Sequence, residues 1–456
     1  MGMALAPISH LGDLRRDRRG AQILERMVEQ TSAQMRVVSS SRAEEVAFSR
    51  FFQNPHFGAE ELRESMREAS LARCAGHAHV LVIQDTTEIN FQHHAGRVRG
   101  LGPVGNGTDA GLFVHAVLAL DAENRTCLGL LDAMPWIRTP RTGDYRRLPV
   151  EQKESRRWLD GMSIASLAQA DMVTCIEDRE SDMFEIFVRR PHERCHVLLR
   201  ACRNRALTDG AYLFAAMAAL PASFGYMVAV PARPGVPARI AQVDVRFGPL
   251  ELQRPQRSNE PTESVRVFAL EIAEPGAKTI PPDQRIHWRL LTTHAIENPV
   301  MAAQIIDWYR QRWHIEQLFR VLKGQGLDLE ASQSEDAHAL TKQAVMATHA
   351  ASRITQLVQA RDGDNGVAAS EVFEPAELEV MAALLPQLEG RTDKQKNPNA
   401  SDTLAWCAWI IARLGGWKGY RHSEGPPGPL TMRRGYQRFC TLRDGYQLGQ
   451  KNVCKP

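Results

Sequence analysis

The stretch NPVMAAQIIDWYRQRWHIEQLFRVLKG, Asn298 to Gly324, predicts one continuous amphipathic helix. Asn298 is a favourable N-cap, Pro299 suits the first helical position, and Gly324 is a common stop. At 100° per residue, one face of this helix is apolar and carries Ile305, Trp308, Ile315, Phe319 and Leu322. A polar stripe borders that face and carries Tyr309, Arg312, Glu316, Arg320 and Lys323.

The polar stripe sets one carboxylate, Glu316, among cations and a phenol at the border of a buried face. A solvated face would instead mix charges of both signs around the whole cylinder. The pattern therefore favours a site that holds a metal ion and a polyanion together.

Composition sets wide bounds on the rest of the chain. With 456 residues, 43% of them apolar and 24% charged, it predicts an ordinary globular protein of two to four domains. The net charge of +3 neither requires nor excludes nucleic acid, although the last 44 residues are more basic than the remainder. Eight scattered cysteines without a CxxC pair argue against a structural zinc site and a disulfide framework. No apolar run has membrane length or resembles a signal peptide, so we expect a cytoplasmic protein with no membrane partner.

The middle of the chain predicts a mixed α/β sheet. Three apolar segments, 79–91, 111–121 and 127–136, follow one another without an intervening helix, which indicates an antiparallel meander. A helix, a strand at 172–176, a short helix and a strand at 196–200 come next. Alternation of strands with helices is typical of an α/β core.

Flanking segments divide the chain into regions of different character. Residues 1–75 predict a helical N-terminal domain whose clustered arginines suit DNA binding, although a plain helical cap would look much the same, and residues 76–330 predict the α/β core. Within that core, 205–295 form a β-rich insertion with about four strands. Residues 331–456 predict a helical C-terminal domain whose basic end suits DNA contact, and its last helix is expected at Met432–Arg443.

Two aspartates follow predicted strands of the core. Asp85 comes after the apolar run VLVI, and Asp178 comes after MVTCI. Carboxylates at strand ends of an α/β sheet point into the crevice where ligands bind. Glu316 would supply a third acid, and Mg²⁺ or Mn²⁺ is the usual partner of such a group. An aspartate after a strand is also a common turn former or helix N-cap, and three nearby acids compete with Asp178 as ligands, namely Glu177, Glu180 and Asp182.

These residues together resemble the bacterial insertion-sequence transposases of the DDE class. Asp85-Thr86-Thr87 resembles the first family motif, and the run from Asp178 to Asp182 resembles the second. The most specific match is the Tyr-Arg-Glu-Lys signature, carried with its spacings by Tyr309, Arg312, Glu316 and Lys323. The resemblance implies a ribonuclease-H-like mixed-sheet core interrupted by the β-rich insertion, with helical domains at both ends.

The same resemblance assigns roles to individual residues. It implies that Asp85, Asp178 and Glu316 hold two Mg²⁺ ions, for which Mn²⁺ can substitute, and that they form the catalytic triad. It also implies DNA contacts for Tyr309, Arg312 and Lys323, and Arg320 joins them because it lies on the same predicted stripe. A solvated basic face is the alternative for these cations.

Two further regions are expected to contact DNA. By the resemblance, Trp288 in the insertion stacks on a flipped base and allows a hairpin at the DNA end, although a strand-core role is the alternative. Arg97 and Arg99 precede the Gly-rich stretch 100–107, which predicts either a DNA-contacting loop or a long hairpin connection.

The resulting hypothesis is a cut-and-paste DDE transposase with metal-dependent cleavage and strand transfer through a hairpin intermediate. Its partners would be double-stranded DNA at the element ends and in the target, with a homodimer in the DNA complex and a nucleoid location when bound. The alternatives are an inactive relative that binds element ends or represses, and a ribonuclease-H-like nuclease that cuts without joining.

Overall fold

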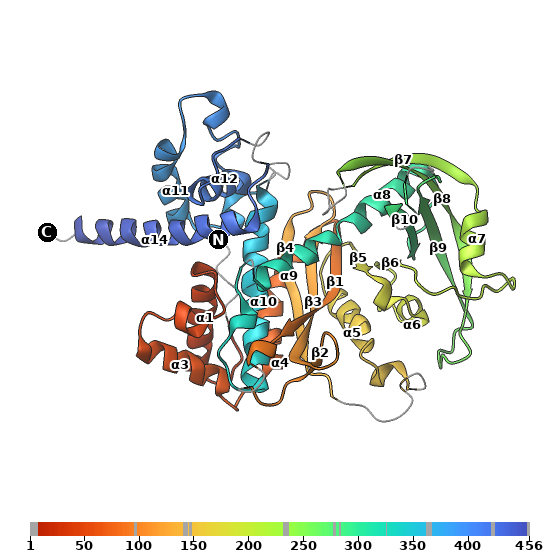
Figure 1. The fold of residues 1–456 in the computed structure, drawn as a ribbon, viewed down its shortest axis with the longest axis horizontal. Coiled ribbons are helices and arrows are strands. Elements are labelled where there is room, and N and C mark those ends of the chain that lie inside the picture. The colour runs from red at the N-terminus through yellow and green to blue at the C-terminus, as the bar shows by residue number, and fades with distance from the viewer. Residues whose placement is uncertain are drawn as a thin grey trace. The chain divides into compact units, whose positions relative to one another are not determined.

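The computed structural model describes residues 8–94, 98–139, 145, 148–230, 237–276, 280–281, 284–324, 326–361, 367–420 and 425–453. The chain forms two compact units (Figure 1). The first contains residues 1–75, 86–140 and 314–456, and the second contains 76–85 and 141–313. Strand β1 (His79–Asn90) contributes its first half to the second unit and its second half to the first unit.

The second unit is built on a sheet whose neighbouring strands change from parallel to antiparallel. β1 pairs in parallel with β5, and β5 pairs in parallel with β6. The remaining pairs are antiparallel, including β10 with β6. In order across the sheet, the strands after β1 are β5 (Met172–Glu177), β6 (Cys195–Arg200), β10 (His287–Thr292), β9 (Ser264–Ala273), β8 (Arg239–Gln253) and β7 (Ala222–Val230).

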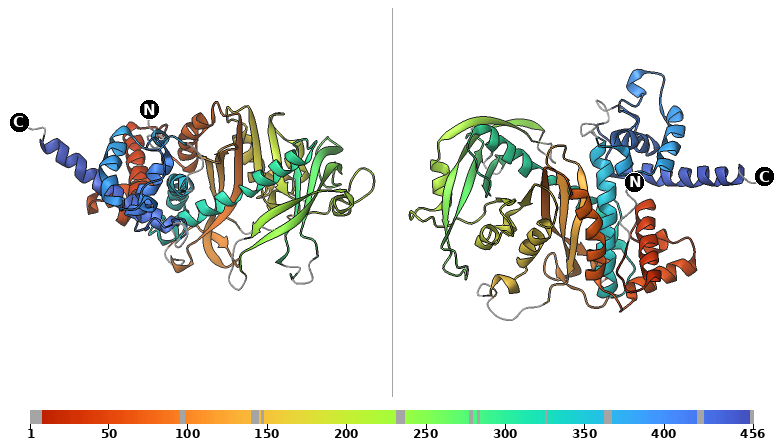
Figure 2. Two further views of the ribbon diagram at one scale, coloured as in Figure 1. Left: turned by 90° about the horizontal axis from the view of Figure 1, so that it is seen from above. Right: turned by 180° about the vertical axis from the view of Figure 1, so that it is seen from behind.

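The first unit continues from the second half of β1. β3 (Asp109–Asp121) neighbours β1 and pairs antiparallel with both β4 (Cys127–Trp136) and the short β2 (Gly102–Val104). Helices α4 (Ala59–Cys74) and α10 (Ala337–Ala360) pack on β4. The views in Figure 2 show these helices beside the strands of the first unit. The β3–β4 pair confirms the antiparallel part of the predicted meander.

The strand pairings confirm the predicted fold class. β4, β3, β1, β5 and β6 are neighbours in this order, and antiparallel and parallel pairs occur in one mixed sheet with packed helices. This is a ribonuclease-H-like α/β arrangement. The four predicted insertion strands are β7, β8, β9 and β10, and they extend the sheet because β10 hydrogen-bonds to β6.

Helices at both ends of the chain belong to the first unit. They confirm the predicted helical character of residues 1–75 and 331–456, and the last helix begins earlier and ends later than the predicted Met432–Arg443. The helices are α1 (Leu14–Glu29), α2 (Met35–Val38), α3 (Arg42–Gln53), α11 (Pro375–Leu388), α12 (Leu404–Leu414) and α14 (Pro429–Val453), besides α4 and α10. In the part of the chain that is described, no helix is both long and apolar enough to cross a membrane.

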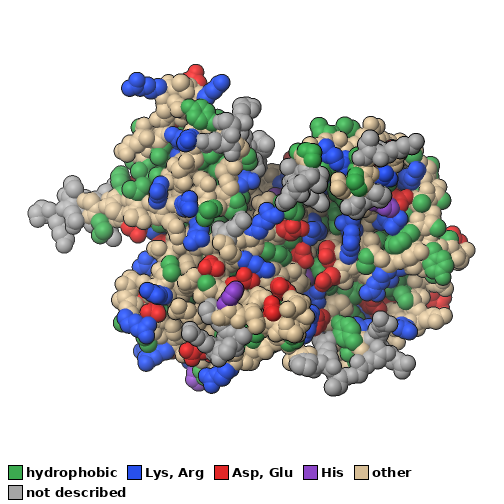
Figure 3. Space-filling model, in the orientation of Figure 1, with side chains coloured by type: hydrophobic (Ala, Val, Ile, Leu, Met, Phe, Trp, Pro, Cys, Tyr) green, Lys and Arg blue, Asp and Glu red, His purple; other side chains and the backbone are tan. Residues whose placement is uncertain are grey.

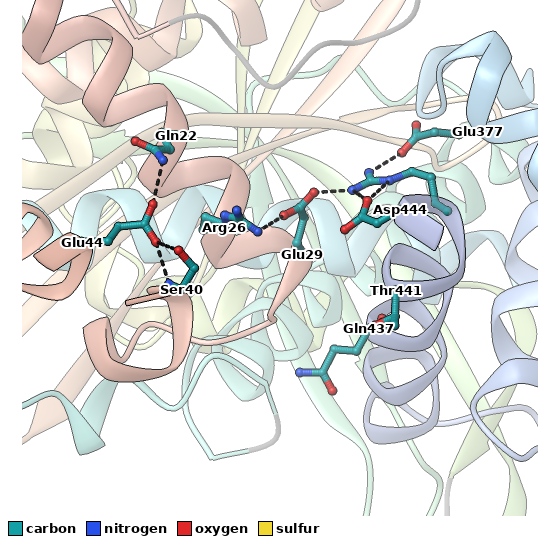
Figure 4. A network of polar contacts seen from close by, with 10 residues as sticks. Gln22, Arg26, Glu29, Ser40, Glu44, Glu377, Gln437, Thr441 and Asp444 are labelled. Atoms are coloured by element: carbon teal, nitrogen blue, oxygen red, sulfur yellow. Dashed lines mark hydrogen bonds and ion pairs between the residues drawn. The ribbon is translucent and has the colours of Figure 1, made fainter. Parts of the chain in front are cut away.

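A polar network ties the two ends of the chain together within the first unit (Figure 4). The Arg443 guanidinium on α14 pairs with Glu29 at the end of α1 and, at 3.0 Å, with Glu377 on α11. Glu29 also accepts from Arg26 at 3.4 Å. Because both Arg443 and Glu29 are largely shielded from solvent, this network holds the C-terminal helix against the N-terminal helices.

The predicted continuous helix at Asn298–Gly324 is wrong in one respect: it is two helices. α8 (Pro299–Arg310) begins with the predicted Asn298 cap, whose side chain accepts from the Met301 N–H, and α9 (Trp313–Leu322) follows after a turn. The Gln311 side-chain amide donates to the Asp307 carbonyl oxygen at 3.0 Å. In an unbroken helix, the backbone N–H of Gln311 would donate to that oxygen. The backbone N–H groups of Gln311 and Arg312 instead bond three residues back, so the helical wheel does not extend across the turn.

Candidate active site

Three polar side chains lie just beyond the parallel-paired segments of three neighbouring strands. Asp85 was expected at the end of the first strand, but it lies inside β1, which continues to Asn90. Continued beyond the last paired residues, the register places Asp85, Asp178 and Arg200 side by side, each two residues past an aligned apolar position. Those apolar positions are Ile83 on β1, Ile176 on β5 and Leu198 on β6. Since side chains alternate along a strand, residues in register project from the same face of the sheet, and neighbouring strands are only about 4.8 Å apart. Two carboxylates and a guanidinium thus gather at one edge of one face.

Helix α8 packs on that same face. The Trp308 ring lies 4.5 Å from the His79 ring and 5.2 Å from the His294 ring, measured between centroids. His79 precedes Asp85 by six residues on β1, so both project from one face. Thr174 Oγ1 joins the cluster, at 2.8 Å from His79 Nε2 and 2.7 Å from His294 Nε2. This packing holds the C-terminal end of α8 near the strand ends.

Arg312 connects the turn after α8 to the first aspartate. Its Nη1 donates to Asp85 Oδ2 at 2.8 Å. The two side chains are only 22% and 18% exposed, so the ion pair is largely removed from bulk water. A partly buried pair of this kind is stronger and more sharply oriented than one on an open surface.

Tyr309 lies in the same charged neighbourhood and is 7% exposed. Burial raises the pKa of its phenol to about 12, while the nearby guanidinium groups of Arg312 and Arg200 oppose that rise and Asp178 adds to it. The phenol is therefore neutral at physiological pH and can act as a hydrogen-bond donor.

Asp178 has a local structural role as well. Its Oδ1 accepts the Glu180 backbone N–H at 2.7 Å and caps the short helix η4 (Arg179–Ser181). Asp178 therefore does act as a helix cap, which was the alternative to a ligand role. The capping hydrogen bond uses one of its two carboxylate oxygens. The half-buried carboxylate keeps its place beside Asp85.

Two of the acids that compete with Asp178 lie elsewhere. Glu177 is fully buried, and the Gln84 amide donates to its Oε1 at 3.1 Å. Burial raises the pKa of Glu177 to about 8, so it is mostly protonated at neutral pH. Glu180 is exposed and pairs with Arg157. Glu177 is the last residue of β5, so alternation along the strand directs it to the opposite face from Asp178, and Glu180 lies in η4.

The third competitor, Asp182, is a buried structural residue. Its Oδ2 accepts the backbone N–H groups of Cys202 and Arg203 at 2.8 Å each, and its Oδ1 accepts from Arg205 at 2.6 Å. These bonds fix the loop that follows β6 and thereby the end of the strand that carries Arg200. Both carboxylate oxygens of Asp182 are therefore used inside the fold.

The pair Asp85 and Asp178 fits a hard divalent cation. Both supply carboxylate oxygens, which Mg²⁺ and Mn²⁺ prefer, and both are half-buried, Asp85 within β1 and Asp178 just after β5. Among the described residues, no group of three or more His, Cys, Asp or Glu side chains is arranged to hold a metal ion. The structure thus brings together two members of the predicted triad, whereas Glu316 belongs to α9 in the other unit.

The remaining predicted DNA contacts fall in different places. Trp288 on β10 is half-buried, and its ring lies 6.3 Å from that of Tyr309. Arg320, which is exposed, lies in the last turn of α9, and the half-buried Lys323 follows the end of that helix. Arg99 has an exposed side chain and a backbone bonded to residues 335 and 337, while Arg97 lies outside the described residues. The Gly-rich stretch 100–107 contains β2, so it is part of a strand hairpin.

Arg200 was given no role on sequence grounds, yet it shares the site. The pKa of its guanidinium is lowered, first by burial and then by Arg179, and Tyr309 and Asp178 act in the opposite direction. Its Nη2 also donates to the His287 carbonyl at 3.0 Å. The available signal was a basic residue ending the apolar strand CHVLLR, the parallel neighbour of the strand that leads to Asp178.

Comparison with known proteins bears on this site. Residues 188–352 match a transposase DDE domain. The matched DDE domain contains Trp288, Arg200 and the Tyr309–Lys323 signature, and it begins after both aspartates. Among solved structures, the cryo-EM structure of piggyBac transposase synaptic complex with hairpin DNA is similar, at 8% identity and a TM-score of 0.36, over 92% of this chain and 75% of that chain.

Charge on the molecular surface is mixed. On the face drawn in Figure 3, Lys and Arg side chains are interspersed with Asp and Glu side chains. This agrees with the net charge of +3. Any attraction for a polyanion on this face would therefore be local.

Proposed function

We propose that the protein is a DDE transposase that cleaves DNA at the ends of its element and joins those ends to target DNA. The placement of Asp85 and Asp178 just beyond the paired residues of β1 and β5, with Arg312 in contact with Asp85, is the observation that supports this most directly. The match to a transposase DDE domain supports it independently.

In this proposal Asp85, Asp178 and Glu316 are the metal-binding carboxylates. When bound there, two Mg²⁺ ions, or Mn²⁺ in their place, supply the polarised water and the charge that stabilises the leaving oxygen. Asp85 would orient these ions from within β1, and Asp178 would do so from the residue after β5. Glu316 follows Arg312 by four residues along the chain, which is why we assign it to the same site.

The cations would hold the DNA backbone. Arg312 and Arg200 offer planar guanidinium groups, which bind phosphate through two parallel hydrogen bonds, and Tyr309 offers a neutral phenol donor. Lys323, Arg320, Arg97 and Arg99 would add further phosphate contacts. We expect the affinity for DNA to fall steeply as salt is raised.

The partners follow from the same chemistry. We propose double-stranded DNA as the substrate, a homodimer in the DNA complex with α14 as a candidate contact, and a bacterial cytoplasmic setting. A hairpin at the cleaved end, formed when the freed 3′-OH attacks the opposite strand, is part of the proposal.

One experiment tests the function. Purified protein is incubated with Mg²⁺ and DNA that carries the element ends, and products are resolved as nicks, hairpins and joined molecules. All three products are expected. Binding without cleavage would favour an end-binding repressor, and nicks without joined products would favour a nuclease.

Arg200 should contribute to end cleavage through a phosphate contact. We expect Arg200→Gln to lower cleavage by about 10- to 100-fold, because a charge-assisted hydrogen bond to a phosphate is worth about 1.5–3 kcal/mol. Cleavage rates at saturating DNA would be measured beside Arg203→Gln, a charge-matched control in the following loop. Equal rates for Arg200→Gln and wild type would remove Arg200 from the site.

Trp288 should act in the hairpin step. Trp288→Ala is expected to reduce hairpin formation more than first-strand nicking, since base stacking on an aromatic ring is worth about 1–3 kcal/mol. Trp288→Phe should recover part of the loss. If both steps fall equally and the melting temperature falls too, Trp288 is a core residue of β10.

A further inference from the structure

The ion pair between Arg312 and Asp85 places a cation on a carboxylate to which the proposed function assigns a metal. The guanidinium Nη1 lies 2.8 Å from Asp85 Oδ2, and both side chains are mostly shielded from water. Asp85 also lies two residues beyond Ile83, the last residue of β1 that pairs with β5, as Asp178 lies two residues beyond its partner Ile176. The pair therefore occupies the metal-binding edge and is not a peripheral surface contact.

A guanidinium and a divalent cation compete for such a carboxylate. Both are positive, and their mutual repulsion is only weakly screened where water is scarce. A metal ion near Asp85 Oδ2 must therefore either displace Arg312 or bind less tightly while Arg312 remains. In the structure, the competitor is built into the turn after α8.

A phosphate group would draw Arg312 away from Asp85. Guanidinium groups bind phosphate through two parallel hydrogen bonds, and the surroundings favour an anion. The guanidinium groups of Arg312, Arg200 and Arg179 all lower the pKa of the Tyr309 phenol. Several cations therefore lie close together around this phenol. A DNA phosphate placed there would satisfy the cations and leave Asp85 available to a metal ion.

We propose that Arg312 is an internal counter-cation for Asp85 in the DNA-free protein, so that DNA binding and divalent-metal binding at Asp85 promote each other. This rests on the proposed function and adds its order of assembly: the metal binds tightly once the DNA backbone holds Arg312. The coupling is reciprocal, because each ligand must raise the affinity for the other by the same factor. It would limit metal-dependent cleavage to DNA seated at the site.

The first test measures Mn²⁺ binding to the DNA-free full-length protein from the electron paramagnetic resonance signal of free Mn²⁺. Arg312→Gln is expected to bind Mn²⁺ about tenfold more tightly than wild type, within the usual range of coupling between two ligands. Arg310→Gln is the matched control. It removes the same charge from the same segment, where Arg310 is exposed and pairs with Asp307 at 3.2 Å, and it should leave the affinity unchanged.

The second test uses the wild-type protein alone, so that it does not depend on how a variant folds. A short blunt duplex of arbitrary sequence is added at low salt, and the Mn²⁺ that the duplex binds by itself is subtracted. The duplex should then tighten Mn²⁺ binding to the protein about tenfold. The same duplex should change the affinity of Arg312→Gln little. Adding Asp85→Asn to Arg312→Gln should abolish the gain, which assigns the metal to Asp85.

The outcomes separate this proposal from the proposed function. If wild type and Arg312→Gln bind Mn²⁺ equally well without DNA, and the duplex tightens neither, the coupling is refuted while the metal site remains. If no protein binds Mn²⁺ with or without the duplex, the metal site and the proposed function both fail. Tight binding that survives Asp85→Asn would place the metal elsewhere and also refute the coupling.

Discussion

Asp178→Asn is expected to reduce DNA cleavage by a factor on the order of 10³ or more while DNA binding is retained. Asparagine is as good a helix cap as aspartate, so its carbonyl oxygen can still accept the Glu180 N–H that caps η4. The substitution therefore removes the negative charge and one hard metal ligand while preserving the local fold. Cleavage of end DNA in Mg²⁺ and binding by gel shift would be measured on the same preparation.

The matched control for this experiment is Glu180→Gln. It removes a carboxylate two residues away, on an exposed side chain that pairs with Arg157 outside the strand-end register. Its cleavage should stay within a few-fold of wild type. Glu316→Gln should behave like Asp178→Asn. If Asp178→Asn cuts as well as wild type, Asp178 is only a cap and the metal assignment is wrong.

Asp182→Ala is expected to lower the free energy of unfolding by about 3–5 kcal/mol. The reason is that Arg205, itself buried, would lose its carboxylate partner, and the backbone N–H groups of Cys202 and Arg203 would lose their acceptor. An uncompensated buried charge is far more costly than the net value of the pair. Urea unfolding followed by tryptophan fluorescence would give the difference.

A double variant separates this explanation from simple cavity formation. Asp182→Ala with Arg205→Met removes the stranded charge and should be more stable than Asp182→Ala alone. If the single variant unfolds at the same urea concentration as wild type, the Asp182–Arg205 pair contributes little. Asp182 would then return to the acids that could serve as ligands.

Much of the fold was predictable because it depends on local patterns. The apolar runs that became β1, β4 and β5 were correctly located, since strands buried on both faces are read directly from hydrophobicity. The Asn298 cap of α8 was likewise correct, because capping depends on neighbouring residues. The continuous helix to Gly324 was wrong because the backbone N–H groups of Gln311 and Arg312 bond three residues back, a local change of hydrogen bonding that hydrophobic periodicity does not show.

The candidate site was predictable in its parts and less so in its arrangement. Asp85 and Asp178 were selected as strand-end acids, but whether Asp178 or its neighbour Asp182 is available to a ligand depends on Arg205, 23 residues further along the chain. Arg200 was missed because its place beside Asp178 comes from the register between β5 and β6. Register is a relation between strands, so no single segment specifies it.

The sequence by itself determined the element types, the strand-end acids and the signature from Tyr309 to Lys323, because hydrophobic period, capping and residue chemistry are local properties. The tertiary structure decided which of these residues meet. It aligned Asp85, Asp178 and Arg200 on one face, buried Asp182 with Arg205, and set Arg312 on Asp85. The Arg312–Asp85 contact joins residues 227 positions apart. It arises from the packing of α8 on the sheet. That packing depends on strand register and side-chain burial, which exist only in the folded chain.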